Sequence, residues 1–444
     1  FWAPTPRGRR CDGVSRRNFL RIGALGLSGL TWADLQLLHA AADAPQPTGR
    51  TKSIVYLFLD GGASQLETFD PKVDVPAEYR SIFGAIQTRL PGVQFGSQFP
   101  LLAGVADQMS IVRTLGHTDG DHGGATHWLK TGNPWPPQFL GQAAIIPQQH
   151  PAMGSVVARR FGATQAGTGV PSYVRVMGRR PGYPGDDAAW LGASYAPLRC
   201  RVGQGNELLD DMELRIDRAR LDERSGLLES LDQWQRRLEA AATTGGVDEF
   251  RRQALHVVLG SARQAFDLSQ EDERCREAYG PGLGQDLLLA RRLCERGSRF
   301  VTINFGNWDH HGDIVPKLQD ACPPLDHAVH AFLQDVQARG LFQDILLVVT
   351  GDFGRTPRIN DRAGRDHWAA INDVLFLGGG LKTGQVVGET DEHAGTVKSR
   401  PVSVQDLMAT LFHALGIERD LQYVDPSGRP RSMVESGEPI RELF

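Results

Sequence analysis

The chain has 444 residues, of which 41% are hydrophobic and 23% are charged, as is typical of a globular protein with a large core. Its formal net charge is −4, its pI is about 6.4, and Lys and Arg are spread along the chain. This distribution argues against nucleic acid as a partner, because proteins that bind nucleic acid concentrate positive charge on one surface.

The amino-terminal residues resemble a bacterial export signal. Arg16 and Arg17 form a twin arginine in the sequence SRRNFLR, and a short apolar segment follows them. Asp34 interrupts this segment before the roughly 20 residues that a membrane span requires. We therefore predict that residues 1–42 are a signal region read by the twin-arginine export machinery, and that residues 43–52 are a linker. The mature protein would be periplasmic or extracellular, with no membrane span; the alternative is an ordinary amphipathic first helix.

The remaining residues, 53–444, are predicted to form one α/β domain. Apolar segments rich in β-branched residues predict strands at 53–59, 110–115, 298–305, 344–350 and 373–377, and helices are expected at 286–295, 324–339 and 404–415. Such alternation is typical of a mostly parallel sheet with helices on both faces. Apolar residues at helical spacing between about 203 and 280 indicate a helical insertion. The segment 117–132, rich in Gly, His and Asp, is expected to be a loop.

Four polar loops follow predicted strands, at 60–64, 117–127, 309–313 and 352–367. The carboxyl ends of parallel strands lie at one edge of a sheet, so these loops are expected to converge on one crevice. Asp309 and His311 alternate along the chain and would place a carboxylate and an imidazole on the same side. Such donors suit zinc, manganese or iron. The alternative is that these polar residues only cap a helix or bind water.

Other loop residues have two interpretations each. His117 and His122 fit no zinc-finger spacing, so a solvated loop competes with a metal site. Ser64 follows two glycines that permit close backbone approach, and a nearby metal would make its hydroxyl a nucleophile; the alternative is a helix N-cap. Arg355 and Arg365 carry planar guanidinium groups that suit an oxyanion; the alternative for Arg365 is that it only braces the loop beside Asp366.

Cysteine spacing excludes two kinds of site. Of the five cysteines, Cys11 lies in the predicted signal region. The other four, Cys200, Cys275, Cys294 and Cys322, show no CxxC spacing, so the chain has neither a zinc knuckle nor a thioredoxin-like motif. Whether they pair outside the cytoplasm is left open.

Several motifs together resemble the DUF1501 family, namely the twin-arginine start, DGGASQ, FGNWDHHGD, TGDFGRTPRIN with AGRDHW, and LGGGLKTGQ. This family comprises exported bacterial proteins, abundant in planctomycetes, that are grouped with the alkaline phosphatase and sulfatase superfamily. The resemblance implies an alkaline phosphatase-like three-layer sandwich with a divalent metal, zinc, manganese or calcium, at the strand ends. It implies a hydrolase of phosphate or sulfate esters on small molecules or polysaccharides. A formylglycine sulfatase is excluded, because the segment after the first strand lacks CxPxR and SxPxR.

The resemblance also implies roles for individual residues. The expected metal ligands are Asp60, Asp309, His311, Asp352 and His367, and the expected catalytic residues are Ser64, Arg355 and Arg365. Further candidates are His117, His122, His310, Asp366 and His393. Phe353 stands where the superfamily often has a histidine ligand. That departure, with the irregular spacing of the DHH segment, supports an alternative function as an exported, non-catalytic binding or scaffold protein with a degenerate metal site.

Overall fold

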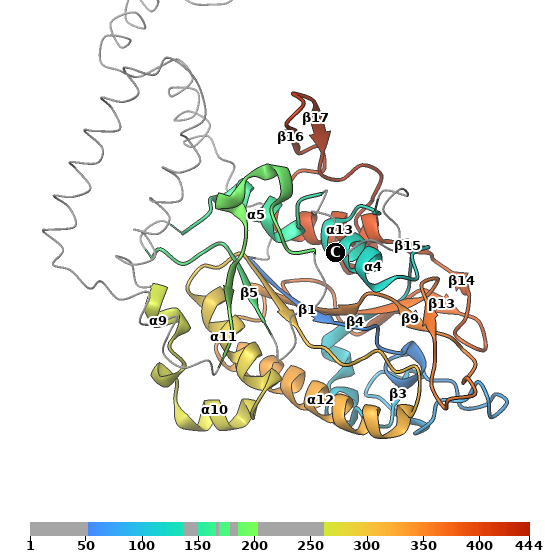
Figure 1. Cartoon of the computed structure of the whole chain (residues 1–444). Coiled ribbons are helices and arrows are strands. Elements are labelled where there is room, and N and C mark those ends of the chain that lie inside the picture. Colours follow the sequence, from blue (N-terminus) through green and yellow to red (C-terminus); the bar gives the residue numbers. More distant parts are fainter. Residues whose placement is uncertain (1–51, 136–149, 166–167, 178–184, 203–261) are drawn as a thin grey trace, which may run out of the picture. The chain divides into compact units, whose positions relative to one another are not determined.

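The computed structural model describes residues 52–135, 150–165, 168–177, 185–202 and 262–444 (Figure 1). The predicted signal region, nearly all of the linker and most of the predicted helical insertion lie outside the described residues. At the carboxyl end of that insertion the described residues are helical, in α9 (Ala262–Phe266) and α10 (Glu273–Tyr279). No helix among the described residues combines the length and apolar character that crossing a membrane would require.

A nine-stranded sheet lies at the centre of the described domain. Its strands follow the order β12 (Gln385–Val387), β4 (Met109–Gly116), β11 (Asn372–Gly378), β8 (Ile345–Gly351), β1 (Ser53–Leu59), β7 (Phe300–Asn304), β5 (Tyr173–Val176) and β6 (Leu198–Cys200), and β15 (Val402–Ser403) also pairs with β4. In this sheet β11 is antiparallel to both of its neighbours, and the other pairings are parallel. The prediction of a mostly parallel sheet is confirmed.

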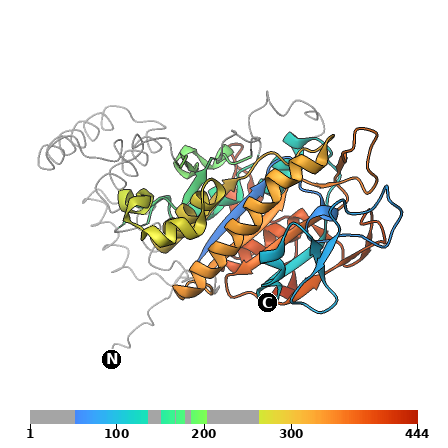
Figure 2. The same cartoon turned by 90° about the horizontal axis from the view of Figure 1, so that it is seen from below.

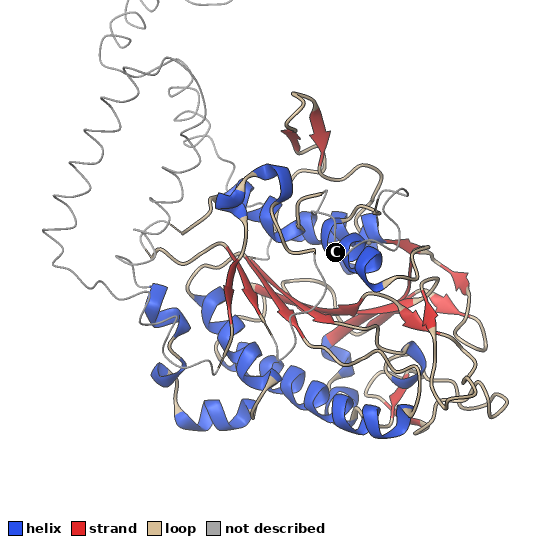
Figure 3. Ribbon diagram, viewed as in Figure 1, coloured by secondary structure: helices blue, strands red, loops and turns tan. Residues whose placement is uncertain are grey.

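Helices cover both faces of this sheet (Figures 1 and 3). One face packs against α3 (Pro100–Ala103), α9, α10, α11 (Leu283–Glu295) and α12 (Ile314–Ala338). The other face packs against α4 (His122–Thr131), α5 (Met153–Phe161) and α13 (Val404–Ala414). Figure 2 shows α11 (yellow) and α12 (orange) lying on one face of the sheet, roughly along its strands. The predicted three-layer α/β sandwich is therefore confirmed.

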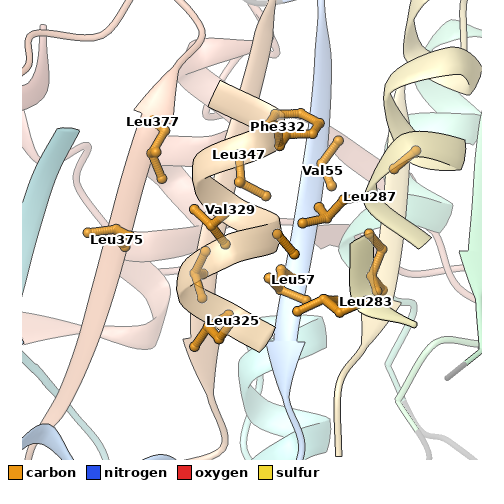
Figure 4. Close-up of a cluster of buried hydrophobic side chains, with 14 of the residues drawn as sticks. Val55, Leu57, Leu283, Leu287, Leu325, Val329, Phe332, Leu347, Leu375 and Leu377 are labelled. Carbon is orange, nitrogen blue, oxygen red and sulfur yellow. The ribbon is translucent and has the colours of Figure 1, made fainter. Parts of the chain in front are cut away.

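Strand β1 shows why the sheet needs both helical layers. All seven of its residues are buried, as in a parallel strand covered on both sides. Because side chains alternate along a strand, Val55 and Leu57 face one core and Tyr56 faces the other. Figure 4 shows Val55 beside Leu287 of α11 and Phe332 of α12, and Leu57 beside Leu283 of α11. A segment that is apolar throughout, with no alternation of polar and apolar residues, thus becomes the central strand.

One helix boundary differs from the prediction. Helix α12 begins at Ile314 instead of near residue 324, and it continues through Pro323 and Pro324. A proline in a helix interior lacks an N–H donor and clashes with the preceding turn, so the sequence suggested a helix start there. In the structure Leu318, Cys322, Leu325 and Val329 bury one continuous side of the helix against the sheet, and this packing compensates for the prolines.

Smaller elements surround the sheet. Four pairs of antiparallel strands lie outside it: β2 (Ala85–Gln87) with β3 (Gln94–Gly96), β9 (Gly354–Arg355) with β10 (His367–Trp368), β13 (Glu389–Thr390) with β14 (Val397–Ser399), and β16 (Gln422–Val424) with β17 (Pro430–Ser432). There are also short 3-10 helices, including η1 (Gln65–Glu67). The four described cysteines are free, and three of them are buried.

Candidate metal centre

Four side chains converge where the loops after β4, β7 and β8 meet. They are His122, Asp309, His311 and His367, and one ligand atom of each lies within 4.8 Å of every other. The carboxylate is the common neighbour, because Asp309 Oδ1 lies 3.3 Å from His122 Nε2, 2.9 Å from His311 Nε2 and 3.2 Å from His367 Nε2. The expected convergence of loops therefore produces a compact cluster of three imidazoles and a carboxylate.

The other ring nitrogen of each histidine contacts an oxygen atom. The three contacts are His122 Nδ1 with Asp352 Oδ2 at 2.5 Å, His311 Nδ1 with Asp366 Oδ1 at 2.6 Å, and His367 Nδ1 with the carbonyl of Gly120 at 2.7 Å. An oxygen acceptor requires a proton on Nδ1, which leaves the lone pair of each neutral imidazole on Nε2. The three lone pairs therefore point into the cluster.

This arrangement fits a divalent cation. His311 Nε2 and His367 Nε2 lie only 2.8 Å apart, and two lone pairs at this distance repel each other unless a positive charge lies beside them. Three imidazole nitrogens and one carboxylate oxygen form a donor set that binds zinc in proteins, and oxygen acceptors on the opposite ring nitrogens are a common feature of such sites. The cluster therefore has both the ligands and the supporting contacts of a metal centre.

The electrostatics of the cluster also favour positive charge. Burial disfavours ionisation of Asp309, but its hydrogen bonds with His122, His367 and Arg355 hold the pKa of this carboxyl well below its usual range. Burial lowers the pKa of His122, whereas hydrogen bonds with Asp309 and Asp352 raise it more strongly, to about 9. Without a metal, a proton on His122 therefore partly neutralises the carboxylates.

Local sequence explains how His122 reaches the cluster. The segment 117–132 was expected to be a loop, but His122 is the first residue of helix α4. Asp121 caps this helix by accepting hydrogen bonds from the backbone N–H groups of Gly123 and Gly124, at 3.0 and 3.2 Å. The two glycines lower helix propensity, which obscured the helix in the sequence. An Asp directly before the histidine is the signal that could have identified it.

Two glycines allow the loops to approach closely. Gly61 has a φ of +103°, and a Cβ atom there would lie 2.6 Å from the backbone nitrogen of Asp309. A Cβ on Gly364 would lie 2.2 Å from the carbonyl carbon of His311. Any larger residue at either position would push apart the loops that carry the ligands.

Comparison with known proteins identifies the family. The model of the family described as "Protein of unknown function (DUF1501)" matches residues 51–444. The chain belongs to this family. No curated protein matches the chain.

Solved structures similar to this DUF1501 protein have low sequence identity to it. They include the PsFucS1 sulfatase from Pseudoalteromonas sp., with 11% identity and a TM-score of 0.40, covering 92% of this chain and 73% of that one. The phosphonate monoester hydrolase SpPMH from Silicibacter pomeroyi has 12% identity and a TM-score of 0.38, with coverages of 88% and 76%. A protein of the alkaline phosphatase superfamily from Vibrio parahaemolyticus has 10% identity and a TM-score of 0.39, with coverages of 84% and 68%.

Two predicted ligands of the DUF1501 protein lie outside the four-residue cluster. Asp352 Oδ2 contacts His122, and its Oδ1 is buried without a hydrogen-bond partner among the described residues. Both carboxylate oxygens of Asp60 accept hydrogen bonds from Asn304 Nδ2, at 2.9 and 2.8 Å, and burial raises the pKa of Asp60 to about 6. Asp352 therefore orients the ligand His122, whereas Asp60 is held by the side-chain amide of Asn304.

Ser64 occupies the N-cap position of η1, but its side chain makes no capping hydrogen bond. Its Oγ is buried and has no hydrogen-bond partner in the described part of the chain. The loop that carries it packs on Asp352, since a Cβ on Gly62 would lie 3.1 Å from Asp352 Oδ1. The geometry thus does not provide the cap that was the alternative role for this serine.

The two arginines brace the loops. Arg355 donates hydrogen bonds to the backbone carbonyls of four residues and, at 2.7 Å, to Asp309 Oδ1. Arg365 forms an ion pair with Glu67 at 2.9 Å and also binds backbone carbonyls. Both guanidinium groups are buried. These contacts favour the bracing interpretation over direct binding of an oxyanion.

The remaining candidates lie around the cluster. His117 Nε2 donates to the carbonyl of Asp352 at 2.7 Å, and Asp366 supports His311 as described above. His310 Nε2 contacts the carbonyl of Asn307 at 2.6 Å, and burial lowers the pKa of His310 to about 4. His393 packs against the ring of Tyr79, at 4.4 Å between centroids, and is not a member of the cluster.

Phe353 forms part of the floor beneath the imidazoles. Its ring is buried, with its centroid 4.4 Å from that of His367 and 4.9 Å from that of His122. It therefore supplies packing instead of a ligand atom next to Asp352.

Proposed function

We propose that this DUF1501 protein is an exported, metal-dependent hydrolase of phosphate or sulfate esters. The observation that supports this proposal is the convergence of three imidazole Nε2 atoms on Asp309, with each Nδ1 held by an oxygen atom. His122, Asp309, His311 and His367 would hold the metal. The substrate would be an ester carried by a small molecule or a polysaccharide.

The donor set narrows the choice of metal. Three nitrogen atoms and one carboxylate oxygen suit zinc best, and manganese less well. Calcium prefers six to eight oxygen ligands, which these four residues do not supply. A divalent cation bound there would act as a Lewis acid toward an ester oxygen.

The chain's own residues would then position and attack the ester. We assign Ser64 as the nucleophile, because its buried Oγ has no hydrogen-bond partner among the described residues and its loop packs on Asp352. Asp352 and Asp366 would keep His122 and His311 in their binding orientations. Asp309, held by Arg355 at 2.7 Å, would remain ionised as a ligand.

Metal analysis and ester assays test this proposal together. The purified protein is expected to contain about one equivalent of zinc or manganese per chain, and to hydrolyse at least one of 4-nitrophenyl phosphate, bis(4-nitrophenyl) phosphate and 4-nitrophenyl sulfate. His311→Ala should remove both the metal and the activity. Ser64→Ala should remove the activity and leave the metal bound. Absence of bound metal in wild-type protein supplied with zinc would refute the proposal.

A second function is favoured by one observation. Phe353 is buried and offers no ligand atom beside Asp352, and the imidazole that contacts Asp352 is that of His122, a member of the four-residue cluster, so Phe353 supplies no ligand for a second cation there. A non-catalytic binding protein would retain the metal at the four-residue cluster but hydrolyse none of the three esters. Bound metal without activity in wild-type protein, and with no change in Ser64→Ala, would support this alternative.

A further inference from the structure

A cavity of about 460 Å³ lies beside the loop that leads to the metal cluster. It opens between the amino-terminal turn of α11, helix α12 and the residues that follow β7. Its volume is within the range of pockets that bind small molecules. Its lining includes Pro281, Leu283, Asp286, Phe305, Asp320 and Pro324.

The charge in this cavity has one sign. Asp286 and Asp320 line it, and none of the described residues that line it is Lys, Arg or His. The Asp286 side chain makes no hydrogen bond or ion pair with another described residue, and burial raises the pKa of its carboxyl to about 7. By contrast, the buried Glu67 is paired with Arg365. A partly buried carboxylate with no side-chain partner among the described residues favours a positive charge beside it.

The walls of the cavity determine which kind of cation fits. Phe305, Leu283 and the two prolines present apolar surface. A bare metal ion needs several ligands at short distance, and among the described residues the only group of three or more His, Cys, Asp and Glu side chains close enough to hold one is the four-residue cluster. An organic ammonium group instead gains from apolar contact, from the face of an aromatic ring and from a nearby carboxylate.

We infer that this cavity binds a small organic cation with an alkylammonium or quaternary ammonium group. Asp286 is its counter-ion, Phe305 and the prolines enclose its alkyl groups, and Asp320 adds negative charge at the opening. The site is separate from the metal cluster, although Asp309 follows Asn307 of the cavity lining by two residues. The inference holds whether or not the metal centre hydrolyses esters.

Binding of choline and of a neutral analogue of the same shape tests the inference. Titration of the full chain with choline at pH 8, followed by calorimetry or NMR, should show saturable binding. The analogue 3,3-dimethyl-1-butanol replaces the charged nitrogen by carbon and should bind at least about tenfold more weakly. Choline affinity should be the same in protein freed of metal with a chelator, which separates this test from the proposed hydrolase.

Two variants and a control locate the site. Asp286→Asn keeps the shape of the side chain and removes its charge, so choline affinity should fall by at least about tenfold. Phe305→Leu should weaken choline binding more than binding of the neutral analogue. Asp344→Asn removes a carboxylate that pairs with Lys52 and does not line the cavity, so it should leave binding unchanged. No saturable binding, equal binding of the two ligands, or unchanged affinity in Asp286→Asn would each overturn the inference.

Discussion

The two carboxylates behind the imidazoles offer a sharp test of the metal centre, because they have similar roles but different burial. Asp352 contacts His122 Nδ1 at 2.5 Å, and its side chain is 0% exposed. Asp366 contacts His311 Nδ1 at 2.6 Å, and its side chain is 46% exposed. The same substitution, Asp→Asn, removes one negative charge at each position and leaves an oxygen that can accept from the imidazole. The two variants therefore differ mainly in how strongly water screens the lost charge.

Loss of such a supporting carboxylate lowers metal affinity by about 10- to 100-fold, or about 1.4 to 2.8 kcal/mol. We expect the loss of metal affinity in Asp366→Asn to lie near the lower value, since solvent already screens the charge of Asp366. The loss in Asp352→Asn should lie near the upper value. Raising the salt concentration should shrink the effect of Asp366→Asn more than that of Asp352→Asn.

Competition with a coloured chelator at fixed pH gives both affinities, and circular dichroism checks that each variant is folded. Asp344→Asn serves as a control for loss of one surface carboxylate. Equal losses in Asp352→Asn and Asp366→Asn, or unchanged affinity in either, would refute the orientation argument for these residues.

Three further predictions follow from buried groups. Glu67→Ala leaves the Arg365 guanidinium buried without its carboxylate, so the free energy of unfolding should fall by about 3 to 5 kcal/mol, measured by chemical denaturation. Burial raises the pKa of Asp286 from 3.8 to about 7, so the folded state binds this proton more tightly than the unfolded state does. The free energy of unfolding should therefore fall as the pH rises from about 4 to 7. Asp286→Asn should flatten this part of the plot of stability against pH. Gly364→Ala places a Cβ 2.2 Å from the backbone of His311, so metal affinity should fall; wild-type affinity would show that the loop can shift without cost.

The central sheet could be predicted because its strands carry a strong local signal. Ser53–Leu59 and Ile345–Gly351 are continuous apolar segments buried on both faces, and the capping box at Ser403 marks the start of the last helix. The start of α12 was missed because Pro323 and Pro324 oppose a helix locally, whereas packing against the sheet stabilises it. Propensity acts within a few residues, but packing acts between distant segments.

Prediction of the candidate site was limited for the same reason, because its residues come together through contacts between distant segments. Asp309, His311 and His367 were expected as ligands because of the family resemblance, and their loops follow predicted strands. His122 also lies after a predicted strand, but it was only a further candidate, because its own segment does not show that it faces Asp309. The bracing role of Arg355 was also hidden, because its partners are backbone carbonyls and Asp309. Side-chain type cannot reveal contacts with carbonyl groups from other segments.

The origin of the four ligands has a consequence for how the protein matures. His122 lies nearly 190 residues before Asp309 in the sequence, and the reversed strand β11 joins β4 to β8, so the ligands meet only after distant strands have paired. Contacts of such long range form late in folding. A cation captured by all four ligands would bind the completed sheet in preference to unfolded chain and so stabilise it by mass action. Metal content would then report that the chain extends at least to His367 and that the strands that position the ligands have paired, since a chain truncated before His367 lacks one of the ligands.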